Sequence, residues 1–349
     1  MLEENRLIDL KALDARETAE WAGGMGLESY RAGQIRHWLF TRLVNSFQEM
    51  TNLSKTLRTH LEREATISRL ERTKTEVSAD GTEKYLFKLR DGNFIESVLI
   101  PERDHFTLCI SSQVGCAMGC RFCLTARQGL RRDLTPSEII DQVIQVRQSR
   151  DRPELLKNVV LMGMGEPLAN YEAVKKALQN LINADGMNFS RRRVTLSTCG
   201  LAPSIKKLGE DVSVKLAVSL NAADDETRSR LMPVNETYPL KKLLQACREF
   251  TLPKGDRITF EYVLIEGVND RDIDAVNLAT LLSRIRAKIN LISFNPYTGT
   301  DFSPPPMEKI RNFQKILLNR DYTAIIRKSR GADISAACGQ LKGGSKEAV

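Results

Sequence analysis

The sequence lacks the apolar run that a membrane-spanning helix needs, since no stretch approaches about 18 apolar residues. Residues 1–6 contain no apolar core of a secretory signal. We therefore expect no membrane association and a cytoplasmic location, where thiols stay reduced. The seven cysteines are then better explained as metal ligands or catalytic thiols than as a disulfide framework. The sequence also lacks internal repeats.

Positive charge exceeds negative charge in this chain. It has 52 Lys and Arg residues against 44 Asp and Glu residues, a net charge of +8. Such a balance favours an anionic partner, and nucleic acid is the commonest one. A merely basic protein without such a partner is the alternative. Clusters of cations favour the nucleic-acid interpretation: Arg131-Arg132, Arg191-Arg192-Arg193, Lys206-Lys207, Lys241-Lys242, and Arg327-Lys328 with Arg330.

The first part of the chain has a helical pattern. Apolar residues recur at helical spacing and would form one stripe on each of two helices: Ile35, Trp38, Leu39 and Leu43, then Leu53, Leu57 and Leu61. Thr51, Asn52 or Ser54 can cap the second helix. We therefore predict a small helical accessory domain over residues 1–78.

A β-hairpin extension is predicted next, over residues 79–104. Tyr85, Phe87 and Leu89 alternate with polar residues, as in a strand with one buried face. Asp91-Gly92 forms a tight turn, and residues 94–100 return as the second strand.

From residue 105 onward, predicted strands alternate with helices. Six apolar, β-rich segments are predicted as strands: residues 107–112, 158–164, 194–199, 214–221, 258–265 and 289–295. Helices are predicted over residues 171–184, 201–208, 240–250 and 275–285, and Thr135-Pro136-Ser137-Glu138 starts another. This order implies an α/β fold with parallel strands, a partial (β/α)6 barrel over residues 105–328. Ligands should bind at the carboxyl ends of its strands.

The end of the chain is rich in small residues. A last strand is predicted over residues 322–327. Residues 329–349 follow as a loop-like, mobile tail, and this tail carries Cys338.

Three cysteines lie close together just after the first strand of the barrel. Cys116, Cys120 and Cys123 form a C-x3-C-x2-C run. Three thiolates at this spacing can hold a cubic iron–sulfur cluster and leave the fourth iron open. S-adenosylmethionine can bind that iron through its amino and carboxylate groups, and reductive cleavage then gives a radical. Zinc sites usually have four ligands and simple electron-transfer clusters use four cysteines, so both alternatives fit less well.

Polar residues and glycines follow the ends of the other predicted strands. Gly163-Met164-Gly165-Glu166-Pro167 ends the second strand, where glycines allow close approach of a ligand and Glu166 can meet an ammonium group. Each such residue alone is more often a structural cap, but together they predict a cofactor site at one rim. The candidate cofactor-binding residues are Gly165, Glu166, Ser197, Ser219, Leu220, Asn221 and Asn295.

Longer motifs resemble one family. Residues 109–116 (CISSQVGC), residues 163–167 (GMGEP) and residues 331–341 (GADISAACGQL) are similar to those of the radical S-adenosylmethionine dual-specificity 23S rRNA/tRNA adenosine C2 methyltransferases. The resemblance covers nearly the whole chain and implies the radical S-adenosylmethionine type of partial barrel. It also implies a [4Fe-4S] cluster and two S-adenosyl-L-methionine molecules per turnover. The implied partners are 23S rRNA, tRNA and an electron donor such as flavodoxin, for a monomeric enzyme.

The resemblance also assigns roles to three residues outside the cysteine run. Cys338 is methylated by one S-adenosylmethionine, loses a hydrogen atom to the radical made from a second, and adds to C2 of adenine. Cys109 resolves the RNA–protein cross-link by forming a transient disulfide with Cys338, and Glu96 accepts or relays the proton. Without the resemblance, these three would be a tail cysteine, a core thiol and a hairpin carboxylate. Cys199 and Cys247 are interpreted as core residues.

Other functions stay open at this point. A C8-methylating antibiotic-resistance relative shares the cluster, both extra cysteines and the tail. A radical enzyme that acts on a non-RNA substrate, or an iron–sulfur protein without turnover, are alternatives of other classes.

If RNA is the substrate, the target base must leave its stack for chemistry at the ring. We expect N-terminal cations to grip the RNA backbone, unless they form an ordinary solvated helix face: Arg31, Arg36, His37, Arg42 and Lys55.

Overall fold

The computed structural model describes residues 7–344. The start of the predicted accessory domain (residues 1–6) and the end of the predicted tail (residues 345–349) lie outside the described residues. In the described part, no helix has the length and apolar character to cross a membrane.

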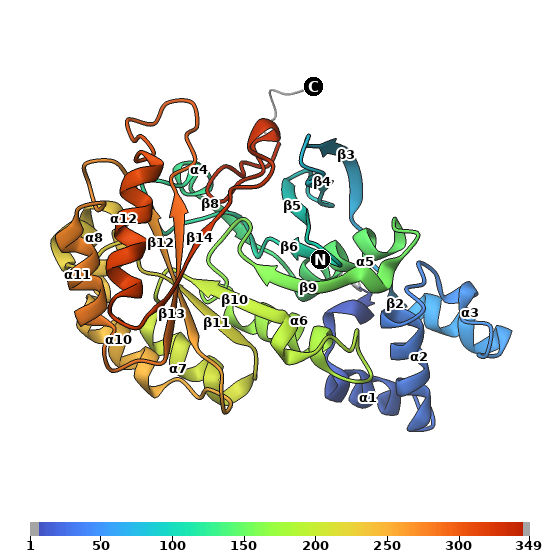
Figure 1. Ribbon diagram of the computed structural model, residues 1–349. Coiled ribbons are helices and arrows are strands. Elements are labelled where there is room, and N and C mark those ends of the chain that lie inside the picture. Colours follow the sequence, from blue (N-terminus) through green and yellow to red (C-terminus); the bar gives the residue numbers. More distant parts are fainter. Residues whose placement is uncertain (1–6, 345–349) are drawn as a thin grey trace, which may run out of the picture.

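A ten-stranded sheet runs through the molecule in the order β14-β13-β12-β11-β10-β9-β6-β5-β4-β3 (Figure 1). The pairings from β6 to β14 are all parallel. These strands confirm the six predicted barrel strands and the predicted last strand: β6 (Phe106–Cys109), β9 (Leu156–Leu161), β10 (Val194–Thr198), β11 (Lys215–Ser219), β12 (Ile258–Leu264), β13 (Ala287–Ser293) and β14 (Thr323–Arg327). The α/β partial barrel is therefore confirmed, with β14 as a seventh parallel strand.

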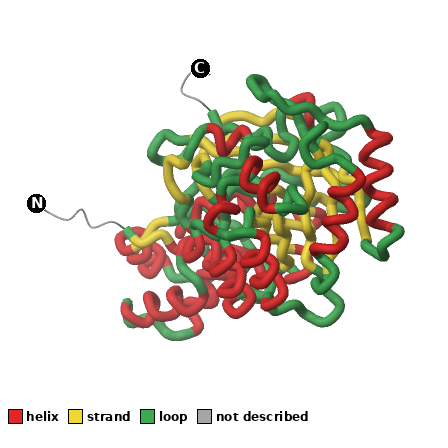
Figure 2. The backbone as a smooth tube through the Cα atoms, turned by 90° about the vertical axis from the view of Figure 1, so that its left-hand side faces the viewer, coloured by secondary structure: helices red, strands yellow, loops and turns green. Residues whose placement is uncertain are grey.

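Helices connect the parallel strands and cover their outer side (Figures 1 and 2). Thr135 caps the first of them with a capping box that includes Glu138, as the sequence predicted. The predicted helices are present, and α8, α9 and α12 are additional: α5 (Pro136–Gln148), α6 (Tyr171–Ile182), α7 (Ala202–Asp211), α8 (Asp225–Leu231), α9 (Val234–Thr237), α10 (Leu240–Glu249), α11 (Asp272–Leu281) and α12 (Met307–Leu318). Short 3-10 helices precede two strands: η3 (Pro153–Leu155) and η4 (Arg191–Arg193).

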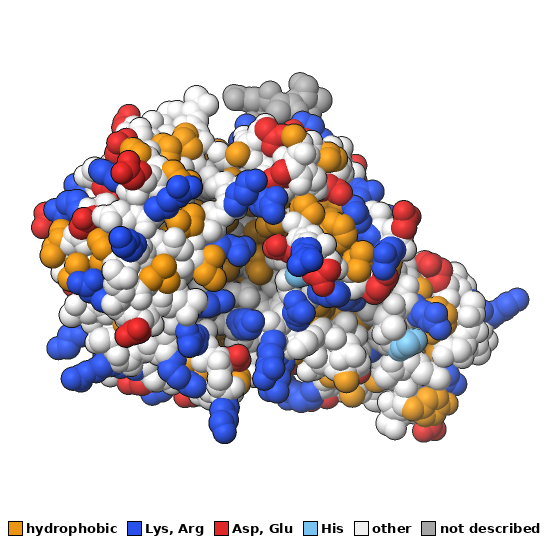
Figure 3. Space-filling view, in the orientation of Figure 1, with side chains coloured by type: hydrophobic (Ala, Val, Ile, Leu, Met, Phe, Trp, Pro, Cys, Tyr) orange, Lys and Arg blue, Asp and Glu red, His pale blue; other side chains and the backbone are white. Residues whose placement is uncertain are grey.

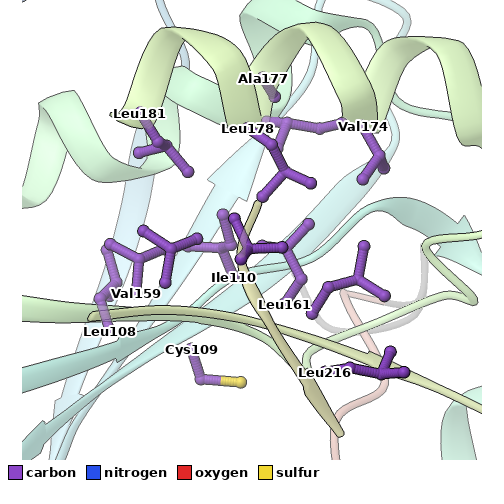
Figure 4. Close-up of a cluster of buried hydrophobic side chains, with 14 of the residues drawn as sticks. Leu108, Cys109, Ile110, Val159, Leu161, Val174, Ala177, Leu178, Leu181 and Leu216 are labelled. Atoms are coloured by element: carbon purple, nitrogen blue, oxygen red, sulfur yellow. The ribbon is translucent and has the colours of Figure 1, made fainter. Parts of the chain in front are cut away.

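The main core lies between the sheet and these helices. Leu178 and Leu181 of α6 are fully buried against Ile110 and Leu161, at the ends of β6 and β9 (Figure 4). Burying one such side chain contributes roughly 1.5–3 kcal/mol. Figure 4 shows the Cys109 side chain on the opposite side of β6 from Ile110, away from α6. The outer face of the sheet therefore stabilises the fold, and Cys109 points into the barrel.

The antiparallel extension has three strands, whereas the sequence predicted a hairpin. β4 (Glu83–Lys88) and β5 (Phe94–Pro101) match the prediction, and β5 pairs with β6, so the extension continues the main sheet. β3 (Glu71–Val77) pairs with β4 and lies within the range assigned to the helical domain. Its residues are mostly charged and exposed, so no apolar alternation marked it. Charged residues on an edge strand oppose pairing with other chains.

The N-terminal part is helical, as predicted. It contains α1 (Ala15–Gly24), α2 (Tyr30–Phe40) and α3 (Lys55–Glu64). Short elements precede, separate and follow these helices: β1 (Ile8–Asp9), η1 (Leu10–Ala12), η2 (Phe47–Glu49) and β2 (Ala65–Thr66). Ser54 caps α3. Of the five cations expected to grip RNA, Arg36 is wrongly assigned, because it is only 1% exposed. Its guanidinium donates to Asp185 at 2.8 Å and to Asn180 at 2.9 Å, so it joins α2 to α6.

The tail is loop-like over residues 329–344, with one short 3-10 helix, η5 (Ala332–Ile334). It crosses from β14 toward the β3–β5 extension (Figure 1). Ser78 donates to the Asp333 carboxylate at 2.6 Å, and the Lys84 ammonium donates to the Ile334 carbonyl at 2.6 Å. On the barrel side, the Leu124 amide donates to the Gly339 carbonyl at 2.7 Å. The tail is therefore held at both ends in this conformation.

Candidate active site

A cavity of about 920 Å³, partly open to solvent, lies at the carboxyl ends of the parallel strands. The loops gather at the same end of the molecule (Figure 2). The cavity brings together most residues that the sequence predicted for the site: Cys116, Cys120, Cys123, Gly165, Glu166, Ser197, Ser219, Asn221, Asn295 and Cys338. Three predicted residues, Glu96, Cys109 and Leu220, do not line it.

The three clustered cysteines form one wall of this cavity. They lie in and at the end of the loop between β7 (Gln113–Gly115) and α4 (Leu124–Arg127). After α4 the chain forms β8 (Leu130–Asp133), which pairs with β7. Gly115 has φ +79°, and a Cβ there would meet the Gly129 carbonyl oxygen at 1.9 Å, so only glycine fits this turn. The Cys116 amide donates to the same carbonyl at 3.0 Å, which fixes the start of the loop.

The electrostatics of this wall suit a metal cluster. Burial raises the pKa of the Cys116 thiol to about 12, and the nearby Cys123 sulfur adds to the rise. Burial also raises the pKa of Cys120, with further contributions from Cys123 and Cys116, so the three sulfurs are close enough to interact. Thiolates here need cationic metal to stabilise them, and binding the metal releases their protons.

The donor set fits an iron–sulfur cluster better than a single ion. Among residues 7–344, no three His, Cys, Asp or Glu side chains are grouped closely enough to hold one metal ion. In a cubic cluster, three cysteines bind three different irons and are therefore further apart than the ligands of one ion. The cavity and its wall of three thiols agree with that arrangement.

Glu166 is buried at the junction of β9 and β10. Its carboxylate accepts backbone N–H groups of Leu168 at 3.0 Å and Cys199 at 2.7 Å. Burial raises the pKa of this carboxyl, while those two amides oppose the rise. Gly165 has φ +100°, and a Cβ there would meet the Gln113 side chain at 2.5 Å. The glycine is thus required by packing within the chain, a reason that the sequence analysis did not foresee.

The other rim residues differ in whether their side chains are already hydrogen-bonded within the protein. Ser197 and Ser219 line the cavity, and within residues 7–344 their hydroxyls make no hydrogen bond, so both can serve a ligand. Asn221, with φ +59°, accepts the Val263 amide at 2.8 Å through its side chain. Leu220 is fully buried and faces away from the cavity, so its side chain cannot touch a ligand there.

Cys338 projects from the tail into the same cavity. Its backbone carbonyl accepts the Asn295 side-chain amide at 3.0 Å, and Ser329 donates to Asn295 at 2.6 Å. The Cys338 side chain is exposed and borders the cavity. The protein atoms packed around its sulfur, with the nearby Glu261 carboxylate, raise the pKa of Cys338 to about 11.

Cys109 lies on the inner side of β6 and is 7% exposed. Burial raises the pKa of its thiol, and the proximity of Cys338 raises it further. Both are free thiols. The structure therefore places the two cysteines within electrostatic reach of each other inside the barrel.

Glu96 lies on β5 and is 4% exposed. Its carboxylate accepts the backbone amides of Lys342 at 2.8 Å and Gly343 at 3.1 Å, and pairs with Lys84 at 3.3 Å. The structure thus gives Glu96 a position outside the cavity, as an anchor of the tail.

Two charged residues at the site were missed by the sequence analysis. Glu261 lines the cavity from β12, and a carboxylate within an apolar strand was a signal that could have found it. Arg228 of α8 is fully buried and donates to the carbonyls of Cys199 at 2.7 Å and Leu220 at 3.2 Å. It joins the loops after β10 and β11, and no local pattern marked it.

Relatives of this chain are found over almost its whole length. The radical SAM superfamily matches residues 110–279, and the ribosomal RNA large subunit methyltransferase N-terminal domain matches residues 8–67. The dual-specificity RNA methyltransferase RlmN of Geobacter sulfurreducens is 55% identical over 337 residues, which are 97% of this chain and 92% of that protein. The protein of the same name from Geotalea uraniireducens is 53% identical over 98% of each chain.

A solved structure is similar to the whole molecule. The crystal structure of a radical SAM methyltransferase from Sphaerobacter thermophilus superimposes with a TM-score of 0.90 and 45% identity. The match covers 96% of this chain and 99% of that one, so it includes the N-terminal helices, the extension and the barrel.

Proposed function

This chain belongs to the dual-specificity RNA methyltransferase family of the radical S-adenosylmethionine superfamily, and we propose that it methylates C2 of adenosine in 23S rRNA and in tRNA. It uses a [4Fe-4S] cluster and S-adenosyl-L-methionine, two molecules per turnover. One observation carries the proposal: the tail brings Cys338 into the cavity that the three clustered cysteines line. A protein that only transferred electrons would need no such thiol.

The three clustered cysteines are the proposed cluster ligands. Cys116, Cys120 and Cys123 would each bind one iron, which leaves one iron for the amino and carboxylate groups of S-adenosylmethionine. When bound, the cluster supplies the electron that cleaves a C–S bond of S-adenosylmethionine and so generates a radical.

The remaining rim residues are proposed to hold S-adenosylmethionine. Gly165 and Glu166 would lie beside its methionine part, and the free hydroxyls of Ser197 and Ser219 can donate hydrogen bonds to it. The other members of the proposed set are Asn221 and Asn295, together with Leu220, which can contribute only its backbone.

Cys338 is the proposed methyl carrier. Its sulfur attacks the methyl carbon of one S-adenosylmethionine, the thiol proton leaves, and S-adenosylhomocysteine departs. The S-methyl group then loses a hydrogen atom, and its carbon bonds to C2 of adenine to give a radical adduct. This adduct would give up one electron, which the oxidised cluster could accept, and the C2 proton, which goes to a base. Cys109, as its thiolate, resolves the resulting cross-link: its sulfur bonds to the Cys338 sulfur, the bond between that sulfur and the methylene carbon breaks, and the methylene carbon takes up a proton to become the new methyl group. The proximity of Cys338 to Cys109, seen in its effect on the pKa of Cys109, supports this pairing.

Glu96 is the proposed proton acceptor, and this role requires the tail to shift. Two of its hydrogen bonds go to the amides of Lys342 and Gly343, so the carboxylate is occupied while the tail is docked. Movement of the tail would free both Glu96 and Cys338 at once. This supports a role for residues 329–344 as a segment that moves during turnover.

The remaining partners are also proposals. Arg31, His37, Arg42 and Lys55 lie at the surface of the N-terminal part, where they can contact the RNA backbone. An electron donor such as flavodoxin would reduce the cluster. We propose a monomer that works in the cytoplasm.

Mass analysis of nucleosides tests the function. The reconstituted enzyme is incubated with S-adenosylmethionine, a reductant and either 23S rRNA or tRNA, and the RNA is then digested. We expect 2-methyladenosine from both RNAs, and none from the Cys116→Ala variant. 8-Methyladenosine would instead identify the C8 activity, and unmodified RNA from the reconstituted wild type would contradict an RNA methyltransferase.

A further inference from the structure

The inner face of β13 and β14 is accessible, whereas parallel sheets usually bury both faces. In β13, Ile289 and Leu291 point outward and are fully buried, while Lys288 and Asn290 point inward and are half-buried. In β14, Ala324 is buried and Ile325 is 42% exposed. The barrel interior beside β13 and β14 is therefore an accessible hollow, whereas Ala217 of β11 and Thr259 of β12, on the same inner face, are buried.

Three cations occupy this inner face. Lys215 and Lys288 lie four residues before Ser219 and Ile292, on the same side of their strands, and both of these residues line the cavity. Ile292 pairs with Arg327 of β14, which places Arg327 on the inner side too. Across the seven parallel strands, Glu261 is the one carboxylate.

In the described part of the chain, the three cations have no ion-pair partner of their own. None of Lys215, Lys288 and Arg327 forms a salt bridge within residues 7–344. Burial lowers the pKa of the Lys288 ammonium, and the nearby Lys215 and Arg327 lower it further, while the Glu261 and Asp256 carboxylates oppose the fall without reversing it. Like charges held together in a partly enclosed hollow cost folding free energy. An anionic partner that enters the hollow would remove this cost.

The hollow is open on one side of the barrel. β14 and β3 are the two edges of the sheet and do not pair, so the barrel is not closed. The tail spans only part of this gap, by its contacts with Ser78, Lys84 and Glu96. Figure 3 shows a hollow at the centre of this face, bordered by Lys and Arg side chains.

We propose that the RNA strand carrying the target adenosine docks in this hollow, with its phosphates on Lys215, Lys288 and Arg327. The proposal rests on the proposed function and adds the place and direction of RNA binding. Phosphates bind cations without regard to base identity, so these contacts would fix the position of the strand. The exposed Ile325, between Thr323 and Arg327, offers an apolar contact for a base or ribose. The adenine would then extend along the inner face toward Cys338, at the carboxyl ends of the same strands.

RNA affinity tests the proposal without turnover. The reconstituted holoenzyme, without reductant, is titrated with a fluorescent tRNA anticodon stem–loop across a range of salt concentrations. The variants are Lys215→Gln, Lys288→Gln and Arg327→Gln, which remove the charge and keep a polar side chain. For each, we expect Kd to rise about fivefold at ~0.1 M salt, and the slope of log K against log salt to fall by about 0.7.

Two controls make the result specific. Arg311→Gln removes an exposed cation from α12, on the outer side of the barrel, and should leave Kd and the salt slope unchanged. Lys288→Arg keeps the charge and should bind RNA within about twofold of the wild type. Thermal unfolding of each variant separates loss of affinity from loss of fold.

The outcomes distinguish this proposal from the proposed function. If all three Gln variants bind RNA with the wild-type Kd and slope while the wild type methylates RNA, the docking surface is wrong and the function stands. If the wild type neither binds nor methylates either RNA, the proposed function fails and the docking proposal fails with it. A common loss of affinity, absent in Arg311→Gln, supports the docking surface.

Discussion

The two faces of the parallel strands have different roles in this molecule. The outer face is apolar, fully buried and covered by helices, as Leu178 and Leu161 illustrate. The inner face is more polar and partly accessible, and carries the half-buried Lys288 and Glu261 and, near its upper rim, the buried Cys109. Because strand side chains alternate, one short segment contributes to both faces. The comparison teaches that stability and chemistry are separated by side of the sheet and not by region of sequence.

The largest expected effect is on RNA methylation, and it should differ between a cysteine of the cavity and a cysteine of the outer helical layer. Cys338→Ala should reduce RNA methylation by at least about 10³-fold, because it removes the proposed methyl carrier. Cys247→Ala is the matched control: Cys247 is 2% exposed on α10, and its loss should cost stability and leave methylation in place. Nucleoside mass analysis measures both. Normal methylation by Cys338→Ala would remove this residue from the mechanism.

The next effect is on stability and should be confined to the outer face. Leu178→Ala on α6 should lower the free energy of unfolding by about 2–5 kcal/mol, because it leaves a cavity against the sheet. Ile325→Ala, on the inner face of β14, removes a partly exposed side chain and should cost less than about 1 kcal/mol. Urea unfolding of both variants gives the values. Equal losses would show that the inner face is packed as tightly as the outer one.

A smaller effect concerns the tail that covers part of the inner face. Glu96→Ala removes two hydrogen bonds to the backbone amides of Lys342 and Gly343. Hydrogen bonds to a charged group contribute about 1.5–3 kcal/mol each, so tryptic cleavage within residues 328–342 should accelerate about tenfold or more. Mass spectrometry of a digestion time course measures this rate. Cleavage at the wild-type rate would mean that Glu96 does not anchor the tail.

The smallest effect is a gain in stability from the inner face. The pKa of Lys288 is lowered in the fold, so its charged form opposes folding at pH values below that pKa. Lys288→Gln should therefore raise the free energy of unfolding by about 0.5 kcal/mol at neutral pH. The gain should vanish as the pH rises past the unfolded value of 10.5, where Lys288 is neutral in both states. The free energy of unfolding of both proteins is measured across this pH range. A difference between Lys288→Gln and the wild type that did not change with pH would contradict the lowered pKa of Lys288.

The parallel strands were predicted well, because each is a short segment rich in apolar residues. β12 and β13 are examples. The sequence also predicted the capping box of α5, since that signal is local. β3 was not predicted, because its charged residues are stabilised as a strand by pairing with β4, and no local pattern encodes that contact. Arg36 was misread for a similar reason: its partners, Asp185 and Asn180, lie far along the chain.

The site shows the same division between local and distant signals. The spacing of Cys116, Cys120 and Cys123 is local, and these residues indeed lie on one wall of the cavity. The anchoring of the tail by Glu96 joins residues more than 240 positions apart, so no spacing could reveal it. The sequence analysis did not single out Lys215 or Lys288, because only the register of the strands places both on one face.

The most direct test of the account follows the two thiols on the inner side. Cys109→Ala is incubated with tRNA, S-adenosylmethionine and a reductant, and the products are separated under denaturing conditions. We expect a covalent RNA–protein adduct, which peptide mass spectrometry should map to Cys338 and to one adenosine carbon. Turnover at the wild-type rate, with no adduct, would contradict the account, because Cys109 would then have no part in releasing the product.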